Sequence, residues 1–347
     1  MKRPRYALPM LVGLLVLGGA LFYSFRTNPD WQEFDLRAFT QTLRDVDLGW
    51  VALAVGAIYV TYILRALRWR VLLRPLKKDS SLSGLLSATI VGFAAIGLMG
   101  RAGELVRPYL IARNENLPVS SQLAVWVLER AFDMLILLAA AGFAVGQIDL
   151  SSLRAGPEVR QWIQTAGQVV GAGTASLLVM LVVLRGYYDT LAAWLAARLG
   201  FLGAARRLKV AHFLEVFGQG LHSMRDGGSV ILCLALSIVQ WLFIAASYYA
   251  ILRASPAGPH LTFTQTLIFM GIVMAGTILQ IPGIGGGMQI TTVLALTELF
   301  GVSVEVSSGM ALLLWVLTFL VVIPPALVVL AWSGLTWGKL RHLESEL

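Results

Sequence analysis

The sequence predicts an all-α polytopic integral membrane protein, with about six full spans and two re-entrant or broken helical hairpins in an inverted repeat. Hydrophobic residues make up 57% of the 347 positions and charged residues only 13%, whereas soluble globular domains carry about 25% charged residues. The apolar residues gather in runs of membrane-spanning length. Lys and Arg gather between these runs. We therefore predict one membrane domain over residues 1–347, without a sizeable soluble domain.

The net charge and the single cysteine are also consistent with an integral membrane protein. The formal net charge is +8, which the gathering of basic residues in cytoplasmic loops explains more simply than nucleic-acid binding does. The one cysteine, Cys233, lies inside an apolar run, so the chain has no intrachain disulfide and the thiol is expected to be buried. We predict no nucleic-acid partner.

Nine apolar runs and two polar stretches organise the chain. Lys2, Arg3 and Arg5 precede the first run, which lacks a convincing cleavage site and is read as a retained span with a cytoplasmic N-terminus. The stretch 30–47 is expected to be a surface helix at the membrane interface. The basic stretch 185–228 is expected to be a cytoplasmic linker, lying on anionic headgroups or simply solvated. The runs are 7–25, 49–67, 84–100, 123–147, 167–185, 229–252, 262–281, 284–300 and 309–333.

The distribution of basic residues predicts two hairpins. Residues 65–79 hold six Lys or Arg and one acidic residue, Asp79, so this loop is assigned to the cytoplasm. Single crossings by the next three apolar runs would place 185–228 outside, against the positive-inside rule. A hairpin at 84–113 that returns to its own side removes the conflict. A similar hairpin at 262–301, entered from outside, leaves the C-terminus in the cytoplasm.

This arrangement forms two units of the same plan, 49–147 and 229–333, each a span, a hairpin and a span. One hairpin opens to the cytoplasm and the other to the outside, so the units are inverted relative to each other. Inverted repeats with interrupted, glycine-rich segments at matching positions indicate a transport site near the bilayer midplane.

The first charged motif lies at the end of an apolar run. Arg101, Glu104 and Arg107 follow one another at spacings of three, which places them on one face of a helix. Gly100 and Gly103 allow close backbone approach or a helix break. Irregular backbone at membrane depth is tolerated where it is buried in protein or lines a wet cavity. The alternative is that these charges extend to the membrane surface.

The second charged motif lies within the run 123–147, towards its cytoplasmic end. Glu129 and Asp133 are four residues apart and share a helix face, and Arg130 can pair with Asp133. Charges inside a membrane span are costly and need partners or a polar cavity. The alternative is a structural ion-pair network that joins this span to Arg101 or Arg107.

The third motif is a glycine-rich break. Pro282 ends a helix, the glycines after it permit a turn closed to other residues, and a helix restarts at about Met288. The N-terminus of such a helix favours anions, phosphate especially. The alternative is a plain tight turn. The glycines are Gly283, Gly285, Gly286 and Gly287.

Other chemistry is not indicated. The four histidines are scattered, without the spacing of metal ligands, and no serine lies in a nucleophile elbow. The sequence therefore predicts neither a metal nor another cofactor. Pro324 and Pro325 predict a kink in the last span.

At these three motifs the chain resembles the transmembrane region of the lysylphosphatidylglycerol synthase family, flippase-like membrane proteins of bacteria and archaea. The resemblance extends from about residue 40 to 333 and implies a stand-alone member without the synthase domain. Gln289 stands where the family usually has glutamate, and Ile284 replaces its second glycine, so a hydrogen-bonding role is expected for Gln289. The matching residues are Arg101, Gly103, Glu104, Arg107, Tyr109, Leu110, Glu129, Arg130, Asp133, Pro282, Gly283, Gly286 and Gln289.

The resemblance implies a flippase or lipid transporter, not an enzyme, in a prokaryotic plasma membrane. It would move an anionic or zwitterionic lipid headgroup, with Arg101, Arg107 and Arg130 holding phosphate. Glu104, Glu129 and Asp133 would position those arginines, meet an amino group or carry a proton. Two alternatives stay open. One is an accessory subunit of a lipid or glycan synthesis enzyme, and the other is a lipid phosphatase or transferase.

Overall fold

The computed structural model describes the backbone of residues 34–147, 157–198, 226–277, 280–281 and 285–333, with a few isolated positions besides. The predicted first span, 7–25, and the C-terminal residues after 333 lie outside this part of the chain. Nearly all of the described backbone is helical. This agrees with the predicted fold class.

Between residues 34 and 147 the chain forms six helical segments. The side chains of Asp35, Asp47 and Ser81 accept backbone N–H groups in the first turns of α2, α3 and α4, as N-terminal caps do. Helix α2, within the surface helix expected at 30–47, packs on the later helix α12 and buries Thr42 there. The segments are α2 (Leu36–Arg44), α3 (Leu48–Leu73), α4 (Leu82–Met99), the 3₁₀ helix η2 (Gly100–Leu105), α5 (Val106–Glu115) and α6 (Val119–Gln147).

The second half adds the long helix α7 (Pro157–Arg198), which includes the start of the predicted linker 185–228. Two short strands, β1 (Gln280–Ile281) and β2 (Gly285–Gly286), pair antiparallel between α10 and α11. The remaining segments are α9 (Gly227–Ala254), α10 (Phe263–Gly276), α11 (Gly287–Leu294), the π-helical η6 (Ala295–Leu299), α12 (Val304–Trp315), the π-helical η7 (Val316–Leu320) and α13 (Ile323–Ser333).

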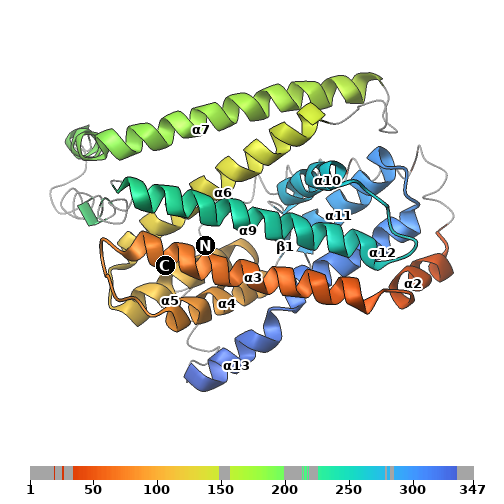
Figure 1. The fold of residues 1–347 in the computed structure, drawn as a ribbon, viewed down its shortest axis with the longest axis horizontal. Helices are drawn as coiled ribbons and strands as arrows, with labels where there is room; N and C mark the ends of the chain where they lie inside the picture. The colour runs from red at the N-terminus through yellow and green to blue at the C-terminus, as the bar shows by residue number, and fades with distance from the viewer. Residues whose placement is uncertain are drawn as a thin grey trace, which may run out of the picture.

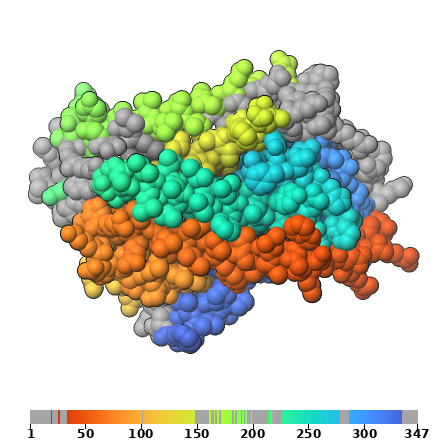
Figure 2. Space-filling view, in the orientation of Figure 1, coloured from red at the N-terminus to blue at the C-terminus, as the bar shows by residue number. Residues whose placement is uncertain are grey.

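Four helical stretches of the described residues are long and apolar enough to cross a membrane: α3, α4, α9 and Val304–Trp332. Helices α3 and α9 lie side by side across the middle of the molecule (Figures 1 and 2). They run antiparallel, because the N–H of Asp47, before α3, donates to the carbonyl of Ala254, at the end of α9, at 2.7 Å. These features are those of a multi-pass helical membrane protein.

The predicted hairpin at 84–113 is present as α4, η2 and α5. Gly100 adopts φ 63°, a left-handed value that suits glycine, and ends α4. Helix α5 then returns along α4, with Gly103 against the backbone of Ala95. At its far end the Glu115 carboxylate accepts the N–H of Ser81 at 3.2 Å. The chain therefore returns to the end of α4 at which it started.

A second hairpin is formed by α10 and α11. Gly286 has φ 105°, and α11 begins one residue before the predicted restart at Met288. Thr291 of α11 packs directly on Gly276 of α10. Strand β1 lies against η2, so the tips of the two hairpins are neighbours. Pro282 and Gly283 of the predicted break lie outside the described residues.

The last span is interrupted at the predicted prolines. Pro325 has no N–H to donate to the carbonyl of Val321 four residues earlier. The Tyr59 hydroxyl of α3 donates to that carbonyl instead, at 2.9 Å. Segment η7 precedes the break, and α13 projects at the lower edge of the molecule (Figures 1 and 2).

Replacing Tyr59 by Phe should destabilise this break. The change leaves a part-buried carbonyl unpaired and should lower the free energy of unfolding by about 1–2 kcal/mol. Thermal unfolding in detergent measures the effect, and Tyr249→Phe, in another aromatic pair of the bundle, is the control. Equal midpoints for Tyr59→Phe and wild type would show that the carbonyl needs no protein donor.

Candidate functional site

Six charged side chains form a connected cluster inside the bundle, where α3, α5 and α6 meet. We call these residues the arginine cluster. Two of them come from α3, one from α5 and three from α6, and four arginines face two carboxylates. Within this set, only Arg130 has a substantially exposed side chain, at 37%. The members are Arg65, Arg68, Arg107, Glu129, Arg130 and Asp133.

Glu129 is the inner anchor of the cluster. Arg107 donates to it through both terminal nitrogens, Nη1 to Oε2 at 2.9 Å and Nη2 to Oε1 at 3.1 Å. Arg68 Nη2 donates to Oε1 at 2.7 Å. A bidentate guanidinium–carboxylate pair fixes orientation as well as distance. Glu129 therefore ties α3 and α5 to α6.

Asp133 is the second anchor, one helical turn further along α6. Arg68 Nη1 donates to Oδ1 at 2.7 Å, and Arg65 Nη1 donates to Oδ2 at 3.3 Å. Arg130 Nη2 lies 3.0 Å from Oδ2. Asp133 thus lies among three guanidinium groups, from α3 and from its own helix.

Helix α9 completes the surroundings of the second anchor. Gln240 Nε2 and Trp241 Nε1 each lie 3.4 Å from Asp133 Oδ1. Ser237 Oγ accepts from Arg68 at 2.8 Å. Helix α9 therefore contributes polar groups to a cluster whose charges all come from α3, α5 and α6.

The positions of Arg65 and Arg68 correct the sequence prediction. Both were assigned to a cytoplasmic loop at 65–79, but α3 continues to Leu73 and buries both side chains. Arg68 is entirely buried. Their spacing of three residues, on the face that also carries the buried Trp69 and Leu72, was the available signal for a helix turned inward.

The cluster carries more positive than negative charge. Its four guanidinium groups face two carboxylates, which leaves two positive charges uncompensated within the six residues. Glu104 interacts electrostatically with Arg130 and reduces that excess to one. Uncompensated charge inside a protein is costly. The arrangement therefore favours an additional anion at the cluster.

The unused hydrogen-bond donors of the cluster also favour an additional anion. The Nε atoms of all four arginines are buried and, within the described part of the chain, have no hydrogen-bond partner. A guanidinium offers five N–H donors in a plane, and buried donors are normally paired. The cluster can therefore still donate hydrogen bonds.

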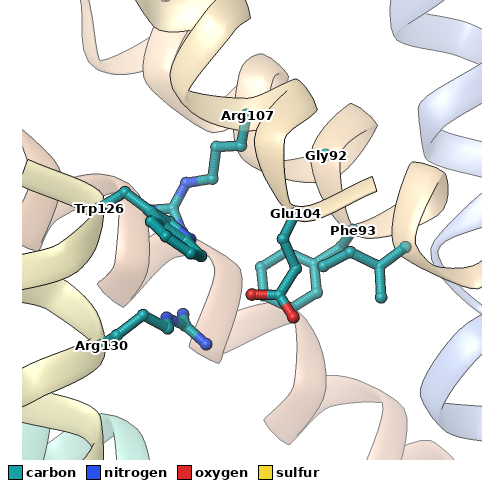
Figure 3. A pocket seen from close by; sticks show the side chains of 7 residues that line it. Gly92, Phe93, Glu104, Arg107, Trp126 and Arg130 are labelled. Carbon is teal, nitrogen blue, oxygen red and sulfur yellow. The ribbon is translucent and has the colours of Figure 1, made fainter. Parts of the chain in front are cut away.

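A pocket opens beside the cluster, between α4, η2, α5 and α6 (Figure 3). Arg107 and Arg130 reach it from one side, and the carboxylate of Glu104 points into the same space. Trp126 and Phe93 contribute aromatic surface. The complete lining is Gly92, Phe93, Ile96, Glu104, Arg107, Trp126 and Arg130.

The structure thus brings together most of the predicted charged residues. Glu104, Arg107, Glu129, Arg130 and Asp133 lie in or beside the arginine cluster, and the predicted ion-pair network between α5 and α6 is present. Glu129 and Asp133, however, contact arginines and are not among the pocket-lining residues.

Two other predicted residues lie elsewhere. The side chain of Arg101 is outside the described part of the chain. Gln289 belongs to the second hairpin, where its Oε1 accepts the N–H of Gly286 at 2.7 Å. This hydrogen bond closes the start of α11, and the binding role expected for Gln289 stays a prediction. No group of three metal-ligating side chains occurs among the described residues.

Comparison with known proteins identifies the family of the chain. Residues 10–326 match the lysylphosphatidylglycerol synthase TM region. The chain belongs to this family. Glycosyltransferase AglD of Haloferax volcanii is 34% identical over 103 residues, which cover 29% of this chain and 16% of that protein. No solved structure matches the chain.

Removing one carboxylate should disrupt the cluster. Glu129→Gln leaves Arg68 and Arg107 without their shared anion, and breaking a buried ion pair from one side costs about 3–5 kcal/mol. We expect a large drop in the unfolding midpoint in detergent. Glu298→Gln, at an exposed carboxylate, is the matched control. A midpoint equal to that of the control would contradict the anchoring role.

A methyl group at Gly92 should separate α5 from α4. An added Cβ would lie 2.6 Å from Arg107 Cβ, and overpacking of this kind costs about 1–3 kcal/mol. Gly56→Ala in α3, where an added Cβ meets no atom within 4 Å, should leave the midpoint unchanged or raise it. Equal tolerance of both changes would show that the hairpin is loosely packed.

Proposed function

We propose that the chain moves an anionic or zwitterionic phospholipid headgroup across the bilayer and is not an enzyme. The observation that carries this proposal is the excess of guanidinium groups, with unpaired Nε donors, beside a pocket inside a membrane bundle. Phosphate is the group that such a planar array of donors binds well. Family membership supports a membrane role.

The two hairpins suggest how the headgroup passes. We propose that 49–147 and 229–333 form an inverted repeat, within about six full spans, and that each hairpin closes one side of the site. Antiparallel packing of α3 and α9, and the meeting of the hairpin tips at η2 and β1, are what such a repeat requires. The chain would lie in a prokaryotic plasma membrane with both ends in the cytoplasm.

Within the site, we propose that some residues contact the headgroup and others hold the contacting residues in place. Arg107 and Arg130 line the pocket and are proposed to hold the phosphate. Arg65 and Arg68 donate to the carboxylates of α6 and would raise the local positive potential without touching the headgroup. Glu104 faces the pocket and would meet the amino group of a zwitterionic headgroup.

One comparison favours a second candidate. The sequence similarity to a glycosyltransferase supports an accessory subunit that presents a lipid substrate to a glycan or lipid synthesis enzyme. This candidate uses the same pocket for binding but requires no net movement of lipid by the chain alone.

Lipid translocation in liposomes tests the proposal. The purified chain is reconstituted with fluorescent phosphatidylglycerol, phosphatidylethanolamine or a polyprenyl phosphate, and loss of signal to a membrane-impermeant quencher is followed. We expect protein-dependent movement that Arg130→Ala slows at least about tenfold, the effect of losing one charge-assisted hydrogen bond. Arg113→Ala, at an exposed arginine of α5 in the first hairpin, should leave it unchanged.

Two outcomes would contradict this function. Folded wild-type protein that moves none of these lipids, but binds one of them, would favour the accessory subunit. Movement that Arg130→Ala leaves intact would show that the lipid follows another route through the bundle.

A further inference from the structure

Trp69 is fully buried, follows Arg68 on α3, and lies outside the pocket lining. The Arg107 guanidinium carbon lies 4.2 Å from the centroid of its ring. Its indole N–H donates to Gln122 Oε1 at 3.2 Å, and Gln122 is itself fully buried. The indole is therefore held in place on one side and carries a guanidinium on its face.

These contacts leave Arg107 little freedom. Glu129 holds both terminal nitrogens, Trp69 covers one face of the guanidinium plane, and Gly92 lets α4 pack against the Cα and Cβ atoms. The guanidinium nevertheless lines the pocket, and its Nε is without a partner among the described residues. The guanidinium is thus held in one orientation at the edge of the pocket.

We propose that Trp69 is a positioning residue for phosphate binding, resting on the proposed function. Its indole fixes the plane of the Arg107 guanidinium, so that the part of this side chain that lines the pocket meets the phosphate without a further loss of side-chain entropy. A long side chain that becomes ordered only when the ligand binds loses entropy at that step, which weakens affinity. A cation held over an aromatic face in a desolvated site is stabilised more than at an exposed one.

Gln122 has a secondary part in this arrangement. Its amide oxygen accepts the indole N–H, and its Nε2 lies 3.2 Å from Ser121 Oγ. The hydrogen bond sets the rotation of the indole, whereas the aromatic face acts on Arg107. Replacing Trp69 by Phe removes the hydrogen bond and keeps a face, while Leu removes both.

The test measures binding and movement separately. Purified variants in detergent are titrated with short-chain phosphatidylglycerol, and in parallel with a polyprenyl phosphate, while the rise in unfolding midpoint is recorded. The same variants are then assayed for translocation in liposomes. Trp50→Leu, which removes a part-buried tryptophan that packs on Tyr249, controls for lost packing.

We expect Trp69→Leu to weaken binding about tenfold, the size of a desolvated cation–π contact. Trp69→Phe should stay within about threefold of wild type, and Trp50→Leu should bind as wild type does. Arg107→Lys keeps the charge but loses the planar donors, so it should bind as weakly as Trp69→Leu. The lipid that shows these differences identifies the source of the phosphate.

A double variant separates positioning from general stability. If Trp69 acts only through Arg107, Trp69→Leu with Arg107→Lys should bind no worse than Arg107→Lys alone, because neighbours in one network are not additive. Additive losses, or equal losses in Trp69→Leu and Trp50→Leu, would overturn the inference.

The two proposals fail in different ways. Wild-type protein that binds a phosphate lipid without moving it contradicts the transport proposal, and the tryptophan series still decides the inference. Movement by wild type that Trp69→Leu leaves unaltered, in rate and in affinity, overturns the inference alone. Folded wild type that binds none of the phosphate lipids overturns both.

Discussion

The structure depends on two carboxylates, Glu129 and Asp133, which hold four guanidinium groups inside the bundle. Ion pairs buried this deeply contribute little net stability, because the cost of removing charges from water offsets their attraction. Their main effect is to fix how the helices are arranged relative to one another. A guanidinium without its carboxylate would be an isolated buried charge, so α3 and α5 must meet α6 in one register, with α9 beside them.

Local spacing was sufficient to find part of this site. The helical offsets among Glu129, Arg130 and Asp133 predicted one charged face, and the glycines at 100 and 103 predicted the break that turns α5 back along α4. Arg65 and Arg68 were missed as site residues because the positive-inside rule counts basic residues by their position relative to apolar runs. Their partners lie more than sixty residues away in sequence, a separation that helical spacing cannot reveal.

The helix breaks, too, could be predicted only in part from the sequence. Glycine and proline predict where a helix stops, since both act through their own backbone. They do not predict what satisfies the groups that the break releases. Tyr59, 262 positions before Val321 in the chain, accounts for the carbonyl freed at the last span, and Gln289 accounts for an N–H at the second hairpin. The contact of Tyr59 required a distant segment to be in place, whereas Gln289 acts on a residue three positions before it, within its own hairpin.

An excess of positive charge held this rigidly limits where movement can occur. The inner arginines share their carboxylates among α3, α5 and α6, so shifting one helix relative to another would separate several ion pairs at once. The hairpin tips are different, because η2 begins at Gly100 with a left-handed φ, contacts β1 and contributes Glu104 to the pocket lining. In the proposed transport function, a fixed cluster would attract one anion from either side while the neighbouring tips change which side is open. Alternating access of this kind moves the barrier around a stationary site, and it requires the arginine cluster to remain intact throughout.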